Sequence, residues 1–362
     1  MGQPGRGLLT FRVDAGTQTG SGHLMRCLAL AQAWKDSGGR VTFITACQSK
    51  GWLQRLRGEG FDLILLTHPY PDPGDWECTK NFLATQPDAW LVLDGYNFDE
   101  AYQRKIKDGG HRLMVIDDMA QLKHYYADIV LNQNLGAEQL KYSCGSRTLL
   151  LLGARYALIR REFLVWRGWK REITDVARSI LVTLGGSDTE NQTFKIIQAL
   201  PQANIPGLEA TVVIGASNPH IDVLKTAAVR SPVPVRLITD ALTMPELMAQ
   251  ADIAISAGGS TCWELAFMGL PNIVLVLSDN QVGIARELAA AGVAIDMGWS
   301  AEVTSNAISQ SLSHIAQTPE TRREMSHRGQ QLIDGGGSKM VIELLKGKGG
   351  LPGVSNKGGE VK

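Results

Sequence analysis

Short apolar runs alternate with helical patterns along almost the whole chain, and this alternation constrains the fold more than any other feature. In the first half, the runs lie at residues 8–13, 41–46, 61–66, 90–93, 113–116 and 129–131. A second series follows at residues 180–186, 211–215, 234–239, 252–259 and 272–278. Parallel strands need crossover connections, so strand–helix alternation predicts parallel sheets with helices on both faces. We therefore expect an α/β fold.

The stretch between the two series, at about residues 153–178, breaks the pattern. It is rich in Arg and Trp and contains no apolar strand core. We interpret it as an interdomain connection; one more surface helix of the first domain is the alternative. A chain of 362 residues is long for a single core. We predict two Rossmann-like domains, residues 1–160 and 179–346, joined by residues 161–178 and facing each other across a cleft, with a disordered tail at residues 347–362.

Charge and composition narrow the possible partners. Lys and Arg together number 36, as do Asp and Glu, so no overall field attracts nucleic acid or an anionic membrane. No apolar run reaches membrane-spanning length, and the N-terminus lacks a signal-peptide core. The five cysteines are scattered without zinc-binding spacing, which favours a reducing cytoplasm. The acidic pair Asp117-Asp118 could bind a metal or substrate, but a structural turn is at least as good an interpretation. We expect a cytoplasmic protein without a metal; its oligomeric state is not legible in the sequence.

Three glycine-containing turns follow predicted strands and precede predicted helices. Their sequences are GSGH at 20–23, GGSD at 185–188 and GGST at 258–261. In an open parallel sheet, ligands bind beyond the carboxyl ends of the strands. Glycine lets the backbone approach a ligand, and free N–H groups at a helix start favour a phosphate. Three equivalent turns favour phosphate binding over simple tight turns, with these candidate binding residues: Gly22, Gly186, Ser187, Ser260 and Thr261.

The sequence argues against two common phosphate ligands. A dinucleotide-binding loop reads GxGxxG, whereas GSGHLM at 20–25 lacks the third glycine. A Walker loop ends in Gly-Lys-Ser/Thr, which does not occur in the chain. NAD and ATP are therefore not expected, and we predict no cofactor. Glu264 follows Ser260 by one helical turn, so its carboxylate could accept both hydroxyls of a ribose. A capping or solvent-facing glutamate is the alternative.

His23 is the candidate general base. It lies at a predicted helix start, where the positive end of the helix dipole disfavours imidazolium and keeps the ring able to accept a proton. Asp14, at the end of the first predicted strand, could orient that ring or bind a substrate hydroxyl, and capping of the following loop is an equal alternative. Arg12 is a further substrate-binding candidate and could, with Arg26, assist with charge. Both could instead be ordinary surface or interdomain arginines.

Beyond these features, the chain resembles a known family over nearly its whole length, up to about residue 346. From Asp14 to Arg26 it resembles the DxxxxxGxGHxxR signature of the UDP-2,4-diacetamido-2,4,6-trideoxy-β-L-altropyranose hydrolases of pseudaminic acid synthesis. Gly16 stands where this family often has serine. The resemblance continues through LVLDGYNFD, VIDDMA, ADIVLNQN, GARYALIRREF, LVTLGGSD and GGSTCWELAFMGLPNIVLVLSDNQ.

This resemblance implies a GT-B architecture and a specific reaction. The family removes UDP from its sugar by attack of water at the anomeric carbon, with inversion and without a metal. Its catalytic histidine corresponds to His23, and Tyr96 would face the sugar or the diphosphate. The resemblance places nucleotide binding at Gly186, Ser187, Ser260, Thr261, Glu264, Asn280 and Gln281. The implied ligand is therefore a UDP-sugar, with neither nucleic acid nor membrane as a partner.

Three alternatives remain open at the level of sequence. A glycosyltransferase of the same fold would pass the sugar to an acceptor hydroxyl instead of water. A hydrolysing UDP-N-acetylglucosamine 2-epimerase shares the architecture. A nucleotide-sugar-binding protein without catalysis would keep the phosphate turns but would not depend on His23.

Overall fold

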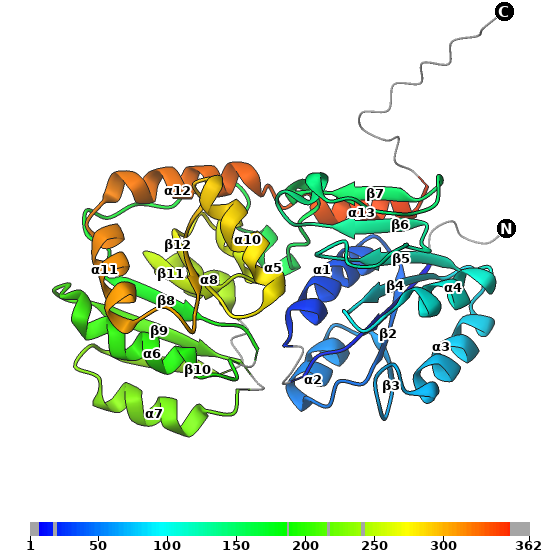
Figure 1. Cartoon of the computed structure of the whole chain (residues 1–362), viewed down its shortest axis with the longest axis horizontal. Helices are drawn as coiled ribbons and strands as arrows, with labels where there is room; N and C mark the ends of the chain where they lie inside the picture. The colour runs from blue at the N-terminus through cyan, green and yellow to red at the C-terminus, as the bar shows by residue number, and fades with distance from the viewer. Residues whose placement is uncertain (1–6, 17–19, 187, 216–217, 240–242, 348–362) are drawn as a thin grey trace, which may run out of the picture.

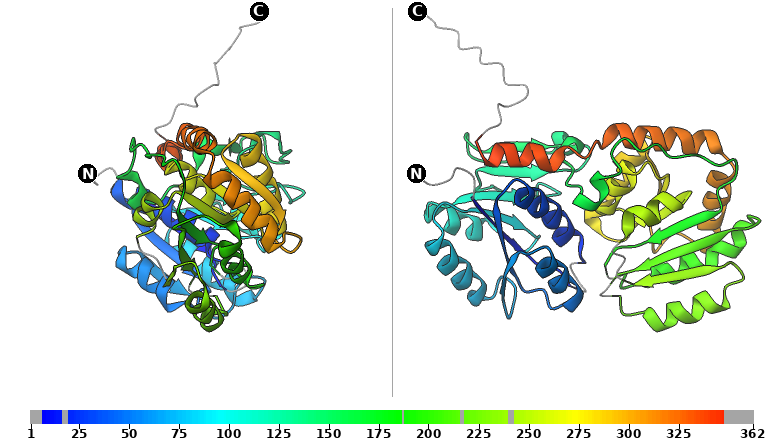
Figure 2. Two further views of the ribbon diagram at one scale, coloured as in Figure 1. Left: turned by 90° about the vertical axis from the view of Figure 1, so that its left-hand side faces the viewer. Right: turned by 180° about the vertical axis from the view of Figure 1, so that it is seen from behind.

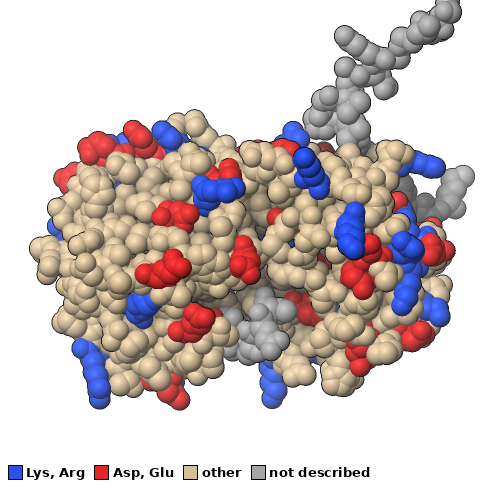
Figure 3. All heavy atoms as spheres, viewed as in Figure 1, with Lys and Arg blue, Asp and Glu red and all other residues tan. Residues whose placement is uncertain are grey.

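The computed structural model describes residues 7–16, 20–186, 188–215, 218–239 and 243–347. These residues form two α/β domains that lie side by side (Figure 1). Each domain contains one parallel sheet, of seven strands in the first and six in the second, so the predicted fold class is confirmed. Within the described part of the chain, no helix is long and apolar enough to cross a membrane. Acidic and basic side chains are interspersed over the face shown in Figure 3.

The first domain has the strand order β3-β2-β1-β4-β5-β6-β7. Its strands are β1 (Leu8–Val13), β2 (Arg40–Thr45), β3 (Asp62–Leu65), β4 (Trp90–Asp94), β5 (Arg112–Ile116), β6 (Ile129–Asn132) and β7 (Leu149–Leu152). Its helices are α1 (Gly22–Asp36), α2 (Lys50–Gly58), α3 (Pro73–Thr85), α4 (Glu100–Asp108), η1 (Ala137–Gln139) and η2 (Ala154–Tyr156). The central strand β4 is buried throughout, and its side chains alternate between two cores. Helices on both faces therefore explain its continuous apolar sequence WLVL.

The second domain repeats this plan with the strand order β10-β9-β8-β11-β12-β13. Its strands are β8 (Ser179–Thr183), β9 (Glu209–Ile214), β10 (Val235–Thr239), β11 (Ile253–Ala257), β12 (Asn272–Val276) and β13 (Ala294–Trp299). Its helices are α6 (Gln192–Ala199), η3 (Leu200–Ala203), α7 (Ile221–Arg230), α8 (Met244–Gln250), α9 (Thr261–Phe267), α10 (Asp279–Ala290), α11 (Ser305–Ala316) and α12 (Pro319–Leu332). The short helix α5 (Arg161–Leu164) lies between the two sheets in the chain.

Two strands were not among the predicted runs. The strand β7 is only four residues long, and β13 is partly exposed with the mixed sequence AIDMGW. Both lie at an edge of their sheet. An edge strand needs less apolar sequence than a central one, which explains the weak signal at β13. The strand β7 has the apolar sequence LLLL, but a run of four residues does not by itself distinguish a strand from a helix segment.

The last helix, α13 (Gly337–Leu345), packs on the first domain although the chain reaches it from the second (Figure 2). Its residues Val341, Ile342 and Leu345 lie in the same core as α1. The indole N–H of Trp90 also donates to the Leu345 carbonyl oxygen at 3.0 Å. The predicted ranges assigned this segment to the second domain, and its apolar face instead covers the first.

In both sheets the strand order reverses at one point, and the two reversals face the same space. The first lies between β1 and β4, and the second between β8 and β11. Loops that leave neighbouring strands there run in opposite directions, which opens a crevice at the carboxyl ends of the strands. The crevices of the two domains meet between the domains.

Candidate active site

A cavity of about 430 Å³ lies between the domains at these two crevices. The first domain contributes the loop at 20–23, Tyr96 and Asp118. The second contributes the turns after β8 and β11 and the start of α10. All three glycine-containing turns predicted from the sequence therefore reach one cavity.

The glycines of these turns permit a close approach of the two domains. A Cβ added to Gly186 would lie 2.9 Å from Ser21 Oγ and 3.0 Å from Ser21 N, across the cleft. A Cβ added to Gly22 would lie 3.4 Å from Ser260 Oγ. Gly16 and Gly20 exchange two backbone hydrogen bonds, of 3.2 and 2.9 Å, which close the loop before α1. The cavity is thus narrow where the two turns face each other.

His23 lies in the first turn of α1 and its ring is held by a buried carboxylate. Its Nδ1 is 2.6 Å from Asp94 Oδ1, at the end of β4. The side chain of Asp94 is completely buried, and that of His23 is 11 % exposed. Arg26 binds the same carboxylate in a bidentate manner, with Nε 2.7 Å from Oδ2 and Nη2 2.7 Å from Oδ1.

This arrangement determines which nitrogen of His23 carries the proton. Burial acts to raise the pKa of Asp94, but Arg26 and His23 outweigh it, and the net pKa lies below its usual value. The ionised carboxylate therefore accepts from the Nδ1–H of His23, which leaves Nε2 unprotonated. Among the residues that the structure describes, none hydrogen-bonds to Nε2. A neutral His23 can therefore accept a proton through Nε2.

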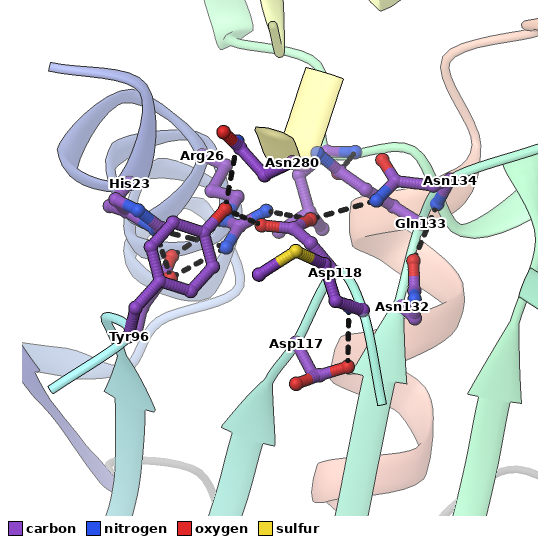
Figure 4. A network of polar contacts seen from close by, with 12 residues as sticks. His23, Arg26, Tyr96, Asp117, Asp118, Asn132, Gln133, Asn134 and Asn280 are labelled. Carbon is purple, nitrogen blue, oxygen red and sulfur yellow. Dashed lines mark hydrogen bonds and ion pairs between the residues drawn. The ribbon is translucent and has the colours of Figure 1, made fainter. Parts of the chain in front are cut away.

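The network extends from Arg26 across the cavity to the second domain (Figure 4). Arg26 Nη1 donates to Asp118 Oδ1 at 2.7 Å, and Tyr96 Oη donates to Asp118 Oδ2 at 2.6 Å. The Tyr96 oxygen then accepts from Asn280 Nδ2 at 2.9 Å. Burial and the charge of Asp118 raise the pKa of Tyr96, so its hydroxyl stays protonated. The ring of Tyr96 meets the His23 ring edge-on, with centroids 4.7 Å apart.

Most of the predicted site residues line this one cavity. They are Gly22, His23, Tyr96, Gly186, Ser260, Thr261, Asn280 and Gln281. Ser187, also predicted, lies outside the described residues. The Gln281 side chain holds the walls together, because its Oε1 accepts from the backbone N–H groups of Gly258 and Leu277 at 3.1 and 3.0 Å.

Two predicted residues, Arg12 in β1 and Asp14 directly after it, lie outside the cavity lining. The Arg12 guanidinium is fully buried and donates to both oxygens of Asp14, at 2.7 Å each, and to Asp75. Asp14 also accepts from the backbone N–H of Ala46 at 2.7 Å. Asp14 directly follows the strand, two residues after Arg12, so the two side chains lie on the same side of the chain and pair with each other. The expectation that Asp14 orients His23 is therefore corrected: Asp94 does so, and Arg12 is a structural cation without contact to the cavity.

Glu264 is the third correction. Its two oxygens accept from Arg160 at 2.6 and 2.9 Å, and the residue does not line the cavity. The segment before α5 thus supplies a bidentate partner for the carboxylate expected to hold a ribose.

At the turn after β8, the Asp188 side chain caps α6 by accepting from the N–H groups of Gln192 and Thr193, both at 2.8 Å. The start of α6 is therefore occupied by a carboxylate and does not offer its free N–H groups to a phosphate.

Two residues of the network, Asp94 and Asp118, were not predicted as site residues, and Asp118 is visible in the sequence only as half of an acidic pair. Asp94 is 71 residues from His23, and Asp118 is 92 residues from Arg26. For Asp94 the available signal was an aspartate directly after the predicted strand at residues 90–93. After the strand at residues 113–116 the same signal points to Asp117, one residue before Asp118. The neighbour of Asp118, Asp117, is structural, since it accepts from the hydroxyls of Tyr125 and Tyr142 at 2.7 Å each. No group of three or more metal-ligating side chains occurs among the described residues.

Comparison with known proteins agrees with this architecture. Residues 179–335 match the glycosyltransferase family 28 C-terminal domain. The spore coat polysaccharide biosynthesis protein SpsG of Bacillus subtilis is 26 % identical over 335 residues, covering 92 % of this chain and 96 % of that protein. The UDP-2,4-diacetamido-2,4,6-trideoxy-β-L-altropyranose hydrolase of Campylobacter jejuni is 26 % identical over 294 residues, covering 79 % and 97 %.

Solved structures with the same fold are more distant in sequence. MurG of Acinetobacter baumannii has a TM-score of 0.67 at 14 % identity, covering 94 % of this chain and 99 % of that one. A putative UDP-N-acetylglucosamine 2-epimerase of Listeria monocytogenes has a TM-score of 0.66 at 14 % identity, covering 94 % and 96 %. The chain therefore has the GT-B fold, with its candidate site in the interdomain cleft.

Proposed function

We propose that this chain hydrolyses a UDP-sugar to UDP and free sugar, by attack of water at the anomeric carbon with inversion. The observation that carries the proposal is the His23–Asp94 pair beside the interdomain cavity, with Nδ1 engaged and Nε2 without a partner among the described residues. A neutral imidazole held in this tautomer is a general base for water. No metal is needed for this step.

The reaction balances with one base and one leaving group. The water oxygen forms a bond to the anomeric carbon while its proton passes to Nε2 of His23. The bond between that carbon and the diphosphate oxygen breaks, and its electron pair leaves with UDP. Ordinary inverting glycosidases need a second carboxyl group as an acid, because their leaving group is a poor one. General-base assistance contributes about 10²-fold to 10⁴-fold, and positioning and charge stabilisation supply the rest.

The second domain is the proposed site of the nucleotide. Its turn after β11 lines the cavity with Gly259, Ser260 and Thr261, and the hydroxyls of the last two are neutral donors. Its turn after β8 lines the cavity with Gly185 and Gly186. Ser278 and Asn280 at the start of α10 line the same cavity, where the Ser278 hydroxyl donates to Asn280 Oδ1 and the Asn280 amide donates one of its two N–H groups to Tyr96. The sugar then lies between these turns and His23. Its identity as 2,4-diacetamido-2,4,6-trideoxy-β-L-altrose is supported by the family resemblance and by the Campylobacter relative of that name.

A glycosyltransferase reaction is the second candidate. It is favoured by the match of residues 179–335 to a glycosyltransferase domain. The two reactions share the donor and differ in the nucleophile, which would be an acceptor hydroxyl instead of water.

The test is to incubate the purified chain with UDP-2,4-diacetamido-2,4,6-trideoxy-β-L-altropyranose, without acceptor or metal, and to follow UDP by phosphorus NMR. We expect stoichiometric UDP and free sugar. His23→Ala should abolish turnover while leaving UDP affinity within roughly a few-fold, because a base contributes to the transition state and little to ground-state binding. His68→Ala, at an exposed histidine, is the matched control. UDP binding without release would favour the transferase.

A further inference from the structure

Arg26 has the positive charge expected of a residue that binds a diphosphate, but its guanidinium is already held by other side chains. Among the described residues that line the cavity, it is the one Arg or Lys side chain. It is nevertheless only 5 % exposed. Three of its N–H donors are already used, two on Asp94 and one on Asp118. A guanidinium has five such donors in a rigid planar fork, so these contacts determine its orientation.

The charge around Arg26 is also already compensated. Asp94 and Asp118 carry two negative charges against its single positive one. Burial acts to raise the pKa of Asp118, but Arg26 outweighs it, and the net pKa lies well below the usual value. Both carboxylates therefore remain ionised near neutral pH. A phosphate placed against Arg26 would meet this net negative charge in a partly dry site, where repulsion is stronger than in water.

Each of the two carboxylates in turn holds a group that faces the cavity. Asp94 accepts from the ring of His23 at 2.6 Å, and Arg26 Nη2 itself lies 3.0 Å from the same Nδ1. Asp118 accepts from the Tyr96 hydroxyl, also at 2.6 Å, and Tyr96 contacts Asn280 of the second domain. Arg26 therefore binds both carboxylates: Asp94, which holds the His23 ring, and Asp118, which holds Tyr96 at its contact with the second domain (Figure 4).

We propose that Arg26 is a positioning residue and not a phosphate ligand: it orients His23 through Asp94 and by direct contact with the ring, and it orients Tyr96 through Asp118. This inference rests on the proposed function, since it assigns Arg26 a part in presenting the base. The diphosphate is then bound by neutral donors of the second-domain turns. The role depends on the bidentate fork, which a lysine ammonium cannot reproduce.

The test separates nucleotide binding from turnover. We would measure the Kd for UDP by calorimetry, kcat with the UDP-sugar, and the tautomer of His23 by nitrogen NMR, in Arg26→Gln and Arg26→Lys. Both variants should bind UDP within roughly a few-fold of the wild type and lose about 10²-fold in kcat, as expected when a reacting group is misplaced by about 1 Å. The ring signals of His23 should shift toward a mixture of tautomers in both. Arg57→Gln, at an exposed arginine of α2, should leave all three readouts unchanged.

A loss of UDP affinity of about tenfold or more in Arg26→Lys and Arg26→Gln, with unchanged His23 signals, would overturn the inference, since that is the signature of lost ground-state binding. Asp118→Asn provides a test should the Arg26 variants not fold, because it keeps the bidentate Asp94–Arg26 pair. It should lower kcat through Tyr96, with wild-type UDP affinity and wild-type His23 signals; weaker UDP binding at unchanged kcat would contradict the inference. The Kd and NMR readouts do not require turnover, so they still decide the inference if the wild type proves not to be a hydrolase.

Discussion

At the scale of residues, the carboxylate of Asp94 is the centre of the site. It accepts from His23 and twice from Arg26, and Cys27 Sγ lies 3.4 Å from its Oδ2. These contacts come from the N-terminal half of α1, so one helix supplies both the base and the groups that keep its partner ionised. The Cys27 thiol itself is not a nucleophile here, because burial and then Asp94 raise its pKa well above the usual value.

Asp94→Asn should lower kcat by roughly 10³-fold to 10⁴-fold, because a neutral amide can donate to Nδ1 and shift the proton to Nε2. Affinity for UDP should stay unchanged, since Asp94 does not line the cavity. Steady-state kinetics, calorimetry and nitrogen NMR of the His23 ring check this. Asp108→Asn, at an exposed aspartate at the end of α4, is the matched control. Wild-type kcat in Asp94→Asn would show that the ring needs no carboxylate partner.

The sequence could point to His23 but not to its partner. A histidine after a Gly-x-Gly turn is a local pattern, visible within a few residues. The pairing with Asp94 spans 71 residues and depends on β4 lying next to β1, which only the strand order reveals. The same limit explains the error at Glu264, whose partner Arg160 lies 104 residues away. The error at Asp14 has a local cause, because Arg12, two residues earlier, binds its carboxylate.

At the scale of elements, the contact between the loop before α1 and the turn after β8 determines how closely the domains approach. Gly186 leaves no room for a side chain against Ser21 of the other domain. Its backbone conformation is not in the left-handed region, so the requirement for glycine is one of space. The sequence predicted ligand binding at both turns, and residues of both line one cavity, but it could not show that the turns contact each other.

Gly186→Ala should lower kcat by about tenfold or more, because a methyl group would push the turns apart and a misplacement of about 1 Å can cost about 10²-fold. Kinetics with the UDP-sugar check this. Gly58→Ala, at an exposed position of α2 with open space around the added Cβ, should behave like the wild type. Equal activity of both variants would show that the approach seen between the turns is not needed for turnover.

The ion pairs of Arg26 also tie α1 to β4 and to the segment after β5. Because the pKa of Asp118 is lowered in the folded state, the unfolded chain takes up this proton first as the pH falls. The stabilisation is therefore complete above the ordinary aspartate pKa of about 4 and is lost as the pH falls below it.

The free-energy difference between wild type and Asp118→Asn should accordingly be largest above about pH 5 and should shrink as the pH falls toward about 3. Urea unfolding at a series of pH values measures it. For Asp108→Asn, whose carboxylate is exposed, we expect a small difference that varies little with pH. A difference for Asp118→Asn that stays constant with pH would contradict the lowered pKa.

At the scale of the whole molecule, the chain forms two similar domains, and its last helix, α13, then packs on the first domain. The two-domain plan could be predicted because strand–helix alternation restarts after residue 178. The return of α13 could not, because an amphipathic helix shows only that one face is buried and not which domain buries it. In the structure this face completes the core that supports α1, and hence His23.

Leu345→Ala should therefore weaken the first domain and not the second. Removal of a buried leucine side chain costs about 2–5 kcal/mol. Hydrogen exchange should accelerate in β1 and α1 and stay unchanged in β11 and β12. The matched variant Leu312→Ala, in the core of the second domain, should give the opposite pattern. Faster exchange confined to the second domain in Leu345→Ala would contradict the placement of α13.

The most direct test of the central claim is to run the reaction in water enriched in heavy oxygen. If water activated by His23 attacks the anomeric carbon, the label enters the free sugar, seen by mass spectrometry, and phosphorus NMR of the released UDP shows no isotope shift. His23→Ala should form neither product. Label in the phosphate of UDP, or turnover that does not depend on His23, would contradict the account.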